Sequence, residues 1–233
     1  MAIKNKEKVG VVITAGGLGK RFGSKVPKQL VKINCVSILE LTLQKFQNCS
    51  AVDFIVISSH SKYISHLEKI IFRKNFRKVK AVVSGGLQRQ DSVWNAISCM
   101  LKYNPEIILI HDAVRPFVSN KIISNVIKAA REYEAAVPAV APKDTIKISD
   151  KDGFVLNTPD RNILFAVQTP QGFKTKVIVE AFQKAYADKF YGTDDASLVE
   201  RLGKKVKLVE GDYRNIKITT KEDFEYASHL YKS

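Results

Sequence analysis

Glycines and basic side chains alternate in the run VVITAGGLGKRFGSKVPKQL, residues 11–30. Glycine lets a backbone come close to a phosphate group, and lysine or arginine supplies the opposite charge. Neither common phosphate-binding fingerprint fits. A P-loop has glycine where Thr14 stands and Ser or Thr where Arg21 follows Gly19-Lys20, and the dinucleotide motif has glycine where Phe22 stands. The run therefore indicates a phosphate site of another class.

Two further segments carry residues able to bind a ligand. SGGLQRQDSVWNAI (84–97) holds a glycine pair and Ser92, and HDAVRPF (111–117) holds Asp112 and Arg115. Each has a plainer interpretation. The glycines could form only a tight turn, Asp112 could cap a helix, and Arg89 with Asp91 could be an exposed surface pair. His111 is interpreted as structural.

Short β-branched runs alternate with segments of helical spacing, which predicts βαβ units and a mainly parallel sheet. The fold class expected is α/β, Rossmann-like, with helices flanking the sheet. Ligands in such folds bind beyond the carboxyl ends of the strands, where the three segments above would meet. The predicted strands are 9–14, 53–58, 79–84, 106–111, 135–140 and 204–210, and the predicted helices are 38–46, 61–72, 89–101, 120–133, 174–187, 194–202 and 220–231.

The alternation breaks after Ala141. KDTIKISDKDGFVLNT (143–158) reads as two polar strands around the turn Asp150 to Gly153. A polar two-stranded ribbon is not stable alone in water. We expect it to lie on the sheet or on another subunit.

Composition narrows the class of protein. The 233 residues are 45% apolar, which suits one globular domain spanning 1–233. No segment approaches the roughly 20 apolar residues of a membrane span, and the first residues do not resemble a secretory signal. Three irregularly spaced cysteines, Cys35, Cys49 and Cys99, indicate neither a disulfide framework nor a zinc site. We therefore expect the reducing cytoplasm.

The net charge of +15 leaves several partners open. The densest basic run, KIIFRKNFRKVK (69–80), could bind nucleic acid, although a solvated helix face is the plainer interpretation. The charge could also attract small polyanions. Four scattered histidines suggest no metal cluster, and no G-x-S-x-G nucleophile elbow occurs.

Seven motifs, taken together, resemble a known family. They are TAGGLGKRFGSKVPKQL, GGLQRQDSVWNAI, LIHDAVRPFV, KDTIK, TPDRNILFAVQTPQGF, TDDASLVE and EGDYRNIKITTKEDF, across roughly residues 9–226. Their order and sequence are similar to those of 2-C-methyl-D-erythritol 4-phosphate cytidylyltransferases. The resemblance implies cytidylyl transfer from CTP to methylerythritol 4-phosphate with Mg²⁺, the nucleotidyltransferase fold, and a homodimer joined by a β-arm at 141–164.

The resemblance also implies roles for individual residues. Arg21 and Lys28 are expected to stabilise the transition state, and Arg161 and Lys217 to position the attacking phosphate. Asp112, Arg115 and Thr145 are expected on the polyol side, with Asp112 also a candidate Mg²⁺ ligand beside the CTP phosphates. If the arm reaches a second subunit, Thr145 and Arg161 act in that subunit's site. The nucleotide-binding residues implied are Ala15, Gly16, Gly17, Leu18, Gly19, Gly86, Leu87 and Ser92.

Two alternatives remain open from the sequence. A ribitol 5-phosphate cytidylyltransferase would share the architecture, although Ala113 and Ala166 favour the isoprenoid enzyme. A basic nucleic-acid-binding protein would use 69–80, but it leaves the motifs after the strands unexplained. The chain also departs from the family pattern at Phe22 and at INCVSIL (33–39), which lacks a Gly-Lys-Pro found in many members.

Overall fold

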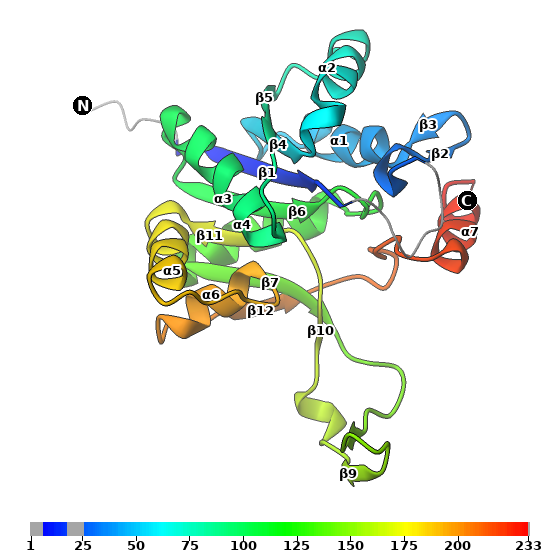
Figure 1. Ribbon diagram of the computed structural model, residues 1–233, viewed down its shortest axis with the longest axis vertical. Coiled ribbons are helices and arrows are strands. Elements are labelled where there is room, and N and C mark those ends of the chain that lie inside the picture. The colour runs from blue at the N-terminus through cyan, green and yellow to red at the C-terminus, as the bar shows by residue number, and fades with distance from the viewer. Residues whose placement is uncertain (1–6, 18–25, 233) are drawn as a thin grey trace.

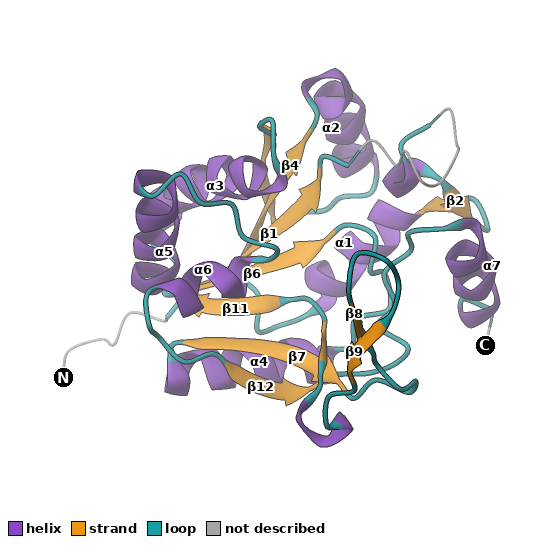
Figure 2. Cartoon of the chain, turned by 60° about the horizontal axis from the view of Figure 1, so that its bottom comes forward, coloured by secondary structure: helices purple, strands orange, loops and turns teal. Residues whose placement is uncertain are grey.

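The computed structural model describes residues 7–17 and 26–232. An eight-stranded sheet forms its centre, flanked by helices on both faces (Figures 1 and 2). In the described chain the strand order is β10-β7-β11-β6-β1-β4-β5, with β12 also paired to β7. The main strands are β1 (Val9–Ala15), β4 (Phe54–Ser59), β5 (Val79–Ser84), β6 (Ile107–Asp112), β7 (Ala135–Val140), β10 (Ala166–Val167), β11 (Gln171–Lys174) and β12 (Lys207–Glu210).

Most of the sheet is parallel, as the alternating pattern predicts. Strand β1 pairs in parallel with β4 on one side and β6 on the other, and β4 pairs in parallel with β5. The chain order therefore reverses at β1, which is where ligands bind in open α/β sheets. The antiparallel strand β11, inserted between β6 and β7, was not predicted.

Continuous apolar strands account for helices on both faces, because successive side chains point to opposite sides. Val11 and Ile13 of β1 pack with α1 (Ile38–Asn48), α2 (Ile64–Arg73) and α4 (Asn120–Tyr133). Val12 packs with α3 (Arg89–Met100), α5 (Thr175–Ala187) and α6 (Asp195–Arg201) on the other face. The predicted helices are confirmed to within a few residues, except that 61–63 form a 3-10 turn before α2.

A smaller cluster holds the last helix. Ile33, in the short hairpin of β2 (Lys32–Ile33) and β3 (Val36–Ser37), packs with Val114, Ile218 and α7 (Lys221–Leu230). This cluster holds the irregular segment before α7 against the loop after β6. Among the described residues, no helix is long and apolar enough to cross a membrane.

The ribbon after β7 extends away from the sheet as an arm, lowest in Figure 1. Its strands, β8 (Ile148–Ser149) and β9 (Val155–Asn157), form a separate two-stranded sheet. Its surface is less polar than the sequence reading suggests, because Phe154 and Leu156 are 72% and 65% exposed. Within the single chain the arm does not lie on the central sheet, so the first of the two expected placements is wrong.

Candidate active site

A cleft of about 290 Å³ opens at the carboxyl end of β1. Its walls come from the segments after β1, β5 and β6 and from the segment before α7. This convergence of distant motifs was expected for the first three. The described lining residues are Thr14, Ala15, Gly16, Gly17, Lys28, Gln29, Gly86, Leu87, Gln88, Arg89, Ser92, Asp112, Ala113, Val114 and Lys217.

The turn after β1 is held open by a buried amide. Gln29 Nε2 donates a 2.6 Å hydrogen bond to the carbonyl oxygen of Ala15, and Gln29 is 4% exposed. Gly16 and Gly17 follow directly and line the cleft. The predicted Leu18, Gly19 and Arg21 lie outside the described residues. The described part of the loop therefore presents backbone to the cleft, with Lys28 on the same wall.

The loop after β5 is shaped by Ser92. Its hydroxyl accepts a hydrogen bond from the Gly86 N–H and donates one to the Gln88 carbonyl oxygen, each at 3.0 Å. A β-carbon at Gly86 would stand 2.3 Å from the Asp91 β-carbon, so only glycine fits there. Leu87 is fully exposed at the cleft wall. Ser92 thus organises the loop, and Leu87 offers an uncovered apolar surface to a ligand.

The first turn of α3 overturns the surface-pair interpretation of Arg89 and Asp91. Asp91 accepts a hydrogen bond from the Gln88 N–H and another from the Tyr186 hydroxyl, so it caps the helix and ties it to α5. Arg89 instead donates two hydrogen bonds, of 3.0 and 2.7 Å, to the carboxylate of Asp195. The sequence interpretation missed Asp195, although it lies within the TDDASLVE motif.

Asp112 lies among three cations at the end of β6. Its carboxylate is 2.9 Å from Lys217 Nζ, 3.6 Å from Arg115 Nε and 3.9 Å from an Arg89 terminal nitrogen. Burial alone would raise the pKa of this carboxyl, but Lys217, Arg89 and Arg115 together hold the pKa well below its usual range. Asp112 is therefore an anion at neutral pH, and it caps no helix in the described chain.

Arg115 lies beside the cleft and is not among the residues that line it. Its side chain is 11% exposed, and it donates a 2.7 Å hydrogen bond to the carbonyl oxygen of Asn215. Asn215 is itself buried and donates to the carbonyl oxygen of Thr169. These bonds fix the segment that carries Lys217, so the geometry gives Arg115 a supporting position.

His111 is structural, as the sequence interpretation held. It is fully buried, its Nε2 lies 3.1 Å from the Arg115 carbonyl oxygen, and its Nδ1 lies 2.9 Å from the Thr169 hydroxyl. A carbonyl only accepts, so Nε2 carries the proton and Nδ1 accepts from Thr169. The same hydroxyl accepts from the Asp112 N–H at 3.2 Å. Burial lowers the pKa of His111 to about 4, which keeps the ring neutral.

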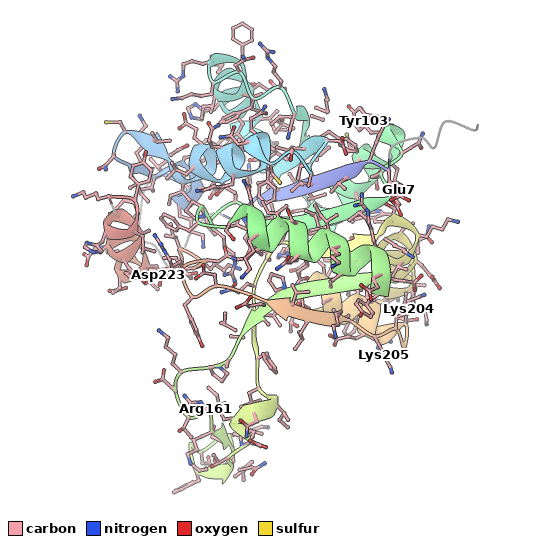
Figure 3. All side chains as sticks on the ribbon, turned by 180° about the vertical axis from the view of Figure 1, so that it is seen from behind. Glu7, Tyr103, Arg161, Lys204, Lys205 and Asp223 are labelled. Carbon is pink, nitrogen blue, oxygen red and sulfur yellow. The ribbon has the colours of Figure 1, made fainter. Side chains whose placement is uncertain are left out.

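Thr145 and Arg161 lie in the arm, outside the cleft of their own chain. Both are exposed, and Arg161 Nε donates to the carbonyl oxygen of Pro142 at 3.0 Å. Figure 3 shows Arg161 in the arm, away from the central sheet. The structure therefore brings together Lys28, Lys217, Asp112 and the described nucleotide-binding residues, and it does not bring Thr145 or Arg161 to them.

Comparison with known proteins shows the family to which the chain belongs. Residues 9–233 match the family model described as 2-C-methyl-D-erythritol 4-phosphate cytidylyltransferase. Relatives of that name from Clostridium perfringens and Syntrophus aciditrophicus are 46% and 43% identical over 97% of this chain, covering 99% and 97% of their own lengths. The crystal structure of 4-diphosphocytidyl-2C-methyl-D-erythritol synthase from Anaerococcus prevotii has a TM-score of 0.86 and 32% identity, covering 97% of both chains. The chain therefore belongs to the 2-C-methyl-D-erythritol 4-phosphate cytidylyltransferase family.

Proposed function

We propose that this protein transfers the cytidylyl group of CTP to 2-C-methyl-D-erythritol 4-phosphate, releasing pyrophosphate. The observation that carries the proposal is the single cleft that joins the glycine turn after β1, the loop after β5 and the basic residues around Asp112. Family membership supports the same reaction. The comparisons favour neither the ribitol 5-phosphate enzyme nor a nucleic-acid-binding protein.

The chemistry needs cations more than a general base. A phosphate monoester has its second pKa near ~6, so at neutral pH the acceptor is already an anionic nucleophile. Its oxygen forms a bond to the α-phosphorus of CTP while the bond from that phosphorus to the β-bridging oxygen breaks. Negative charge crowds both sides of the reaction, and fixed cations lower that barrier. Lys28 and Lys217 line the cleft and meet this need, while Arg89 beside them is bound to Asp195.

The nucleotide is proposed to lie along the glycine turn. Ala15, Gly16 and Gly17 line the cleft, where their backbone suits the triphosphate, and Gly86, Leu87 and Ser92 line the wall proposed for the cytosine. A ring stacked there would cover the exposed Leu87 side chain. Lys28 is assigned to the transferring phosphate. Arg21, Leu18 and Gly19 keep the roles that the resemblance implies.

Lys217 is proposed to hold the attacking phosphate. Its side chain is 43% exposed and lines the cleft, and its ammonium group is anchored at 2.9 Å by Asp112. Asp112 and Arg115 are proposed to act on the polyol side, Arg115 through the segment that it holds. An ammonium anchored in this way is oriented before the substrate arrives, which is the arrangement that favours rate.

The described residues fit a magnesium ion carried in with the nucleotide. Mg²⁺ is commonly held by one or two carboxylates together with substrate phosphates. Asp112 supplies one carboxylate in the cleft, and the described chain holds no group of three or more His, Cys, Asp or Glu side chains that could bind a metal alone. We therefore propose that Asp112 and the CTP phosphates share the ion, which when bound would neutralise part of the triphosphate charge.

The arm is proposed to complete the cleft of a second copy of the chain. It projects from the sheet with apolar side chains uncovered, among them Phe154, Leu156 and Ile163. Burying them in a homodimer would remove this surface from water. Thr145 and Arg161 would then reach the partner's polyol side. Light scattering at micromolar concentration is expected to show a dimer, and a monomer would contradict the proposal.

The proposed compartment is the cytoplasm. The three cysteines within the described chain are free. Free thiols are usual in a reducing compartment.

The function is tested by measuring pyrophosphate release with CTP and Mg²⁺. Methylerythritol 4-phosphate and ribitol 5-phosphate are offered separately, and ATP, GTP and UTP replace CTP in parallel reactions. We expect rapid release only with CTP and methylerythritol 4-phosphate. Faster release with ribitol 5-phosphate would transfer the proposal to that acceptor, and no release with any pair would refute nucleotidyl transfer.

A further inference from the structure

A bidentate ion pair between Arg89 at the cleft wall and the buried Asp195 forms a fork that joins α3 to α6. Arg89 spans both carboxylate oxygens of Asp195 with hydrogen bonds of 3.0 and 2.7 Å. Asp195 is 1% exposed and is not among the cleft-lining residues, whereas Arg89 lines the cleft. Burial raises the pKa of Asp195, but the two short guanidinium bonds favour its ionised form, and Asp195 and Asp112 raise the pKa of Arg89 against the effect of burial. Both oxygens of Asp195 accept hydrogen bonds from the guanidinium, which leaves neither oxygen placed to carry a proton, so the geometry is that of an ion pair.

Neighbouring contacts keep Asp195 in place. It is the first residue of α6, and the next N–H, that of Ala196, donates to Gln171 Oε1 at 3.1 Å. Gln90, next to Arg89, donates to the Phe190 carbonyl oxygen at 3.1 Å and accepts from the Gly192 N–H at 3.0 Å. Polar contacts on either side of the fork thus join α3 to the segment before α6. A shift of Arg89 or Asp195 would strain these contacts.

The position of this fork determines what Asp112 can bind. One Arg89 nitrogen is 2.7 Å from Asp195 but 3.9 Å from Asp112, so the guanidinium is engaged with Asp195 first. Asp112 is left to make its short contact, 2.9 Å, with Lys217. Asp112 and Asp195 therefore compete for the guanidinium of Arg89, and Asp195 binds it.

We propose that Asp195 is a positioning residue for the transfer step, which holds Arg89 away from Asp112 so that Asp112 can orient Lys217. The proposal rests on the proposed function. Without the Asp195 charge, Arg89 would turn to Asp112, the nearest remaining carboxylate. The Asp112 carboxylate would then bind both Arg89 and Lys217, and the ammonium group of Lys217 would lose its fixed orientation. The loop 85–88 has its own hydrogen bonds, so nucleotide binding would change little.

The test is Asp195→Asn, which keeps the shape and removes the charge. We expect kcat to fall at least tenfold while the KM for CTP changes by less than about threefold, since the loss is in orientation rather than in binding. Asp188→Asn is the matched control. Asp188 pairs with Arg201 at 2.8 Å and with Lys184 at 2.6 Å, away from the cleft lining, and its replacement should leave kcat as in wild type.

A second comparison separates positioning from folding. In a Lys217→Ala background, adding Asp195→Asn should lower kcat little further, because both changes remove the same orientation. If Asp195→Asn does not fold, Arg89→Lys takes its place, since lysine keeps the charge but cannot span both carboxylate oxygens. The same kcat loss and the same lack of additivity are expected.

Three results would overturn the inference. One is a lower thermal midpoint with unchanged kcat, which would make the fork purely structural. Another is a kcat loss equal to that of Asp188→Asn. The third is a full additional loss in the Lys217→Ala background. Failure of the wild-type protein to release pyrophosphate at all would instead refute the proposed function, so the two failures are distinguishable.

Discussion

The buried imidazole of His111 makes the stability of this protein sensitive to acid. Its pKa falls from 6.5 in the unfolded chain to about 4 in the folded one, because burial disfavours the charged ring. The unfolded state therefore binds a proton at a higher pH than the native state does. The free energy of unfolding is therefore not reduced by His111 above pH 6.5. It falls progressively as the pH drops from 6.5 towards about 4.

The size of the effect follows from these two values. Between pH 7.5 and pH 5 the unfolded ring becomes almost fully protonated and the native ring stays almost neutral. The free energy of unfolding should fall by about 2 kcal/mol through this residue alone. Protonation would also turn Nδ1 into a donor facing the Thr169 hydroxyl, which now bridges to the Asp112 N–H. Protonation of His111 would therefore disturb the hydrogen bonds that link Thr169 to Asp112 at the cleft.

The assay is urea unfolding in metal-free buffer at the two pH values, followed by the fluorescence of Trp94, which stacks on Phe182 at a centroid distance of 5.5 Å. The quantity compared is the change in unfolding free energy between pH 7.5 and pH 5. His111→Gln should show a change smaller than wild type by about 2 kcal/mol. His66→Gln, at an exposed site, is the matched control. Equal changes in wild type and His111→Gln would show that His111 does not cause the acid sensitivity.

The remaining predictions concern the cleft and the arm. Lys28→Ala should lower kcat for pyrophosphate release roughly 100-fold, as loss of a preorganised charge does, and near-normal turnover would remove Lys28 from the mechanism. Gly86→Ala places a β-carbon 2.3 Å from that of Asp91, so the loop must shift and the KM for CTP should rise roughly tenfold; an unchanged KM would place the base elsewhere. Arg161→Ala mixed with Lys28→Ala should recover roughly a quarter of wild-type activity, since half of randomly assembled dimers then hold one intact cleft. No recovery would mean that Arg161 does not act across subunits.

The sheet was predictable because its physical causes are local. Short β-branched runs such as 9–14 are typical of buried strands, and Ser119 caps α4 by accepting a hydrogen bond from the Ile122 N–H. The antiparallel strand β11 could not be predicted, because Gln171–Lys174 is too short and mixed to show a period. Its place is fixed by pairing with β6 and β7, which lie far away in the chain.

The sequence predicts the parts of the site that lie in glycine turns or short motifs. It does not predict ion pairs between residues far apart in the chain. The glycines after β1 and β5 and Asp112 at the end of β6 follow from the rule that ligands lie at the carboxyl ends of strands. The fork between Arg89 and Asp195 joins residues 106 positions apart, and no local pattern marks which carboxylate an arginine will choose. Its one signal was the TDDASLVE motif, in which Asp194 caps α6 and Asp195 faces inward.

In the proposed reaction, the cleft at the end of β1 directs one phosphate onto the α-phosphorus of CTP. The most direct measurement supplies CTP labelled with ³²P at either the α or the γ position, together with Mg²⁺ and methylerythritol 4-phosphate, and separates the products. The α label is expected in the cytidylylated alcohol and the γ label in pyrophosphate. An α label that appears as free CMP, or that stays in CTP, would contradict the account.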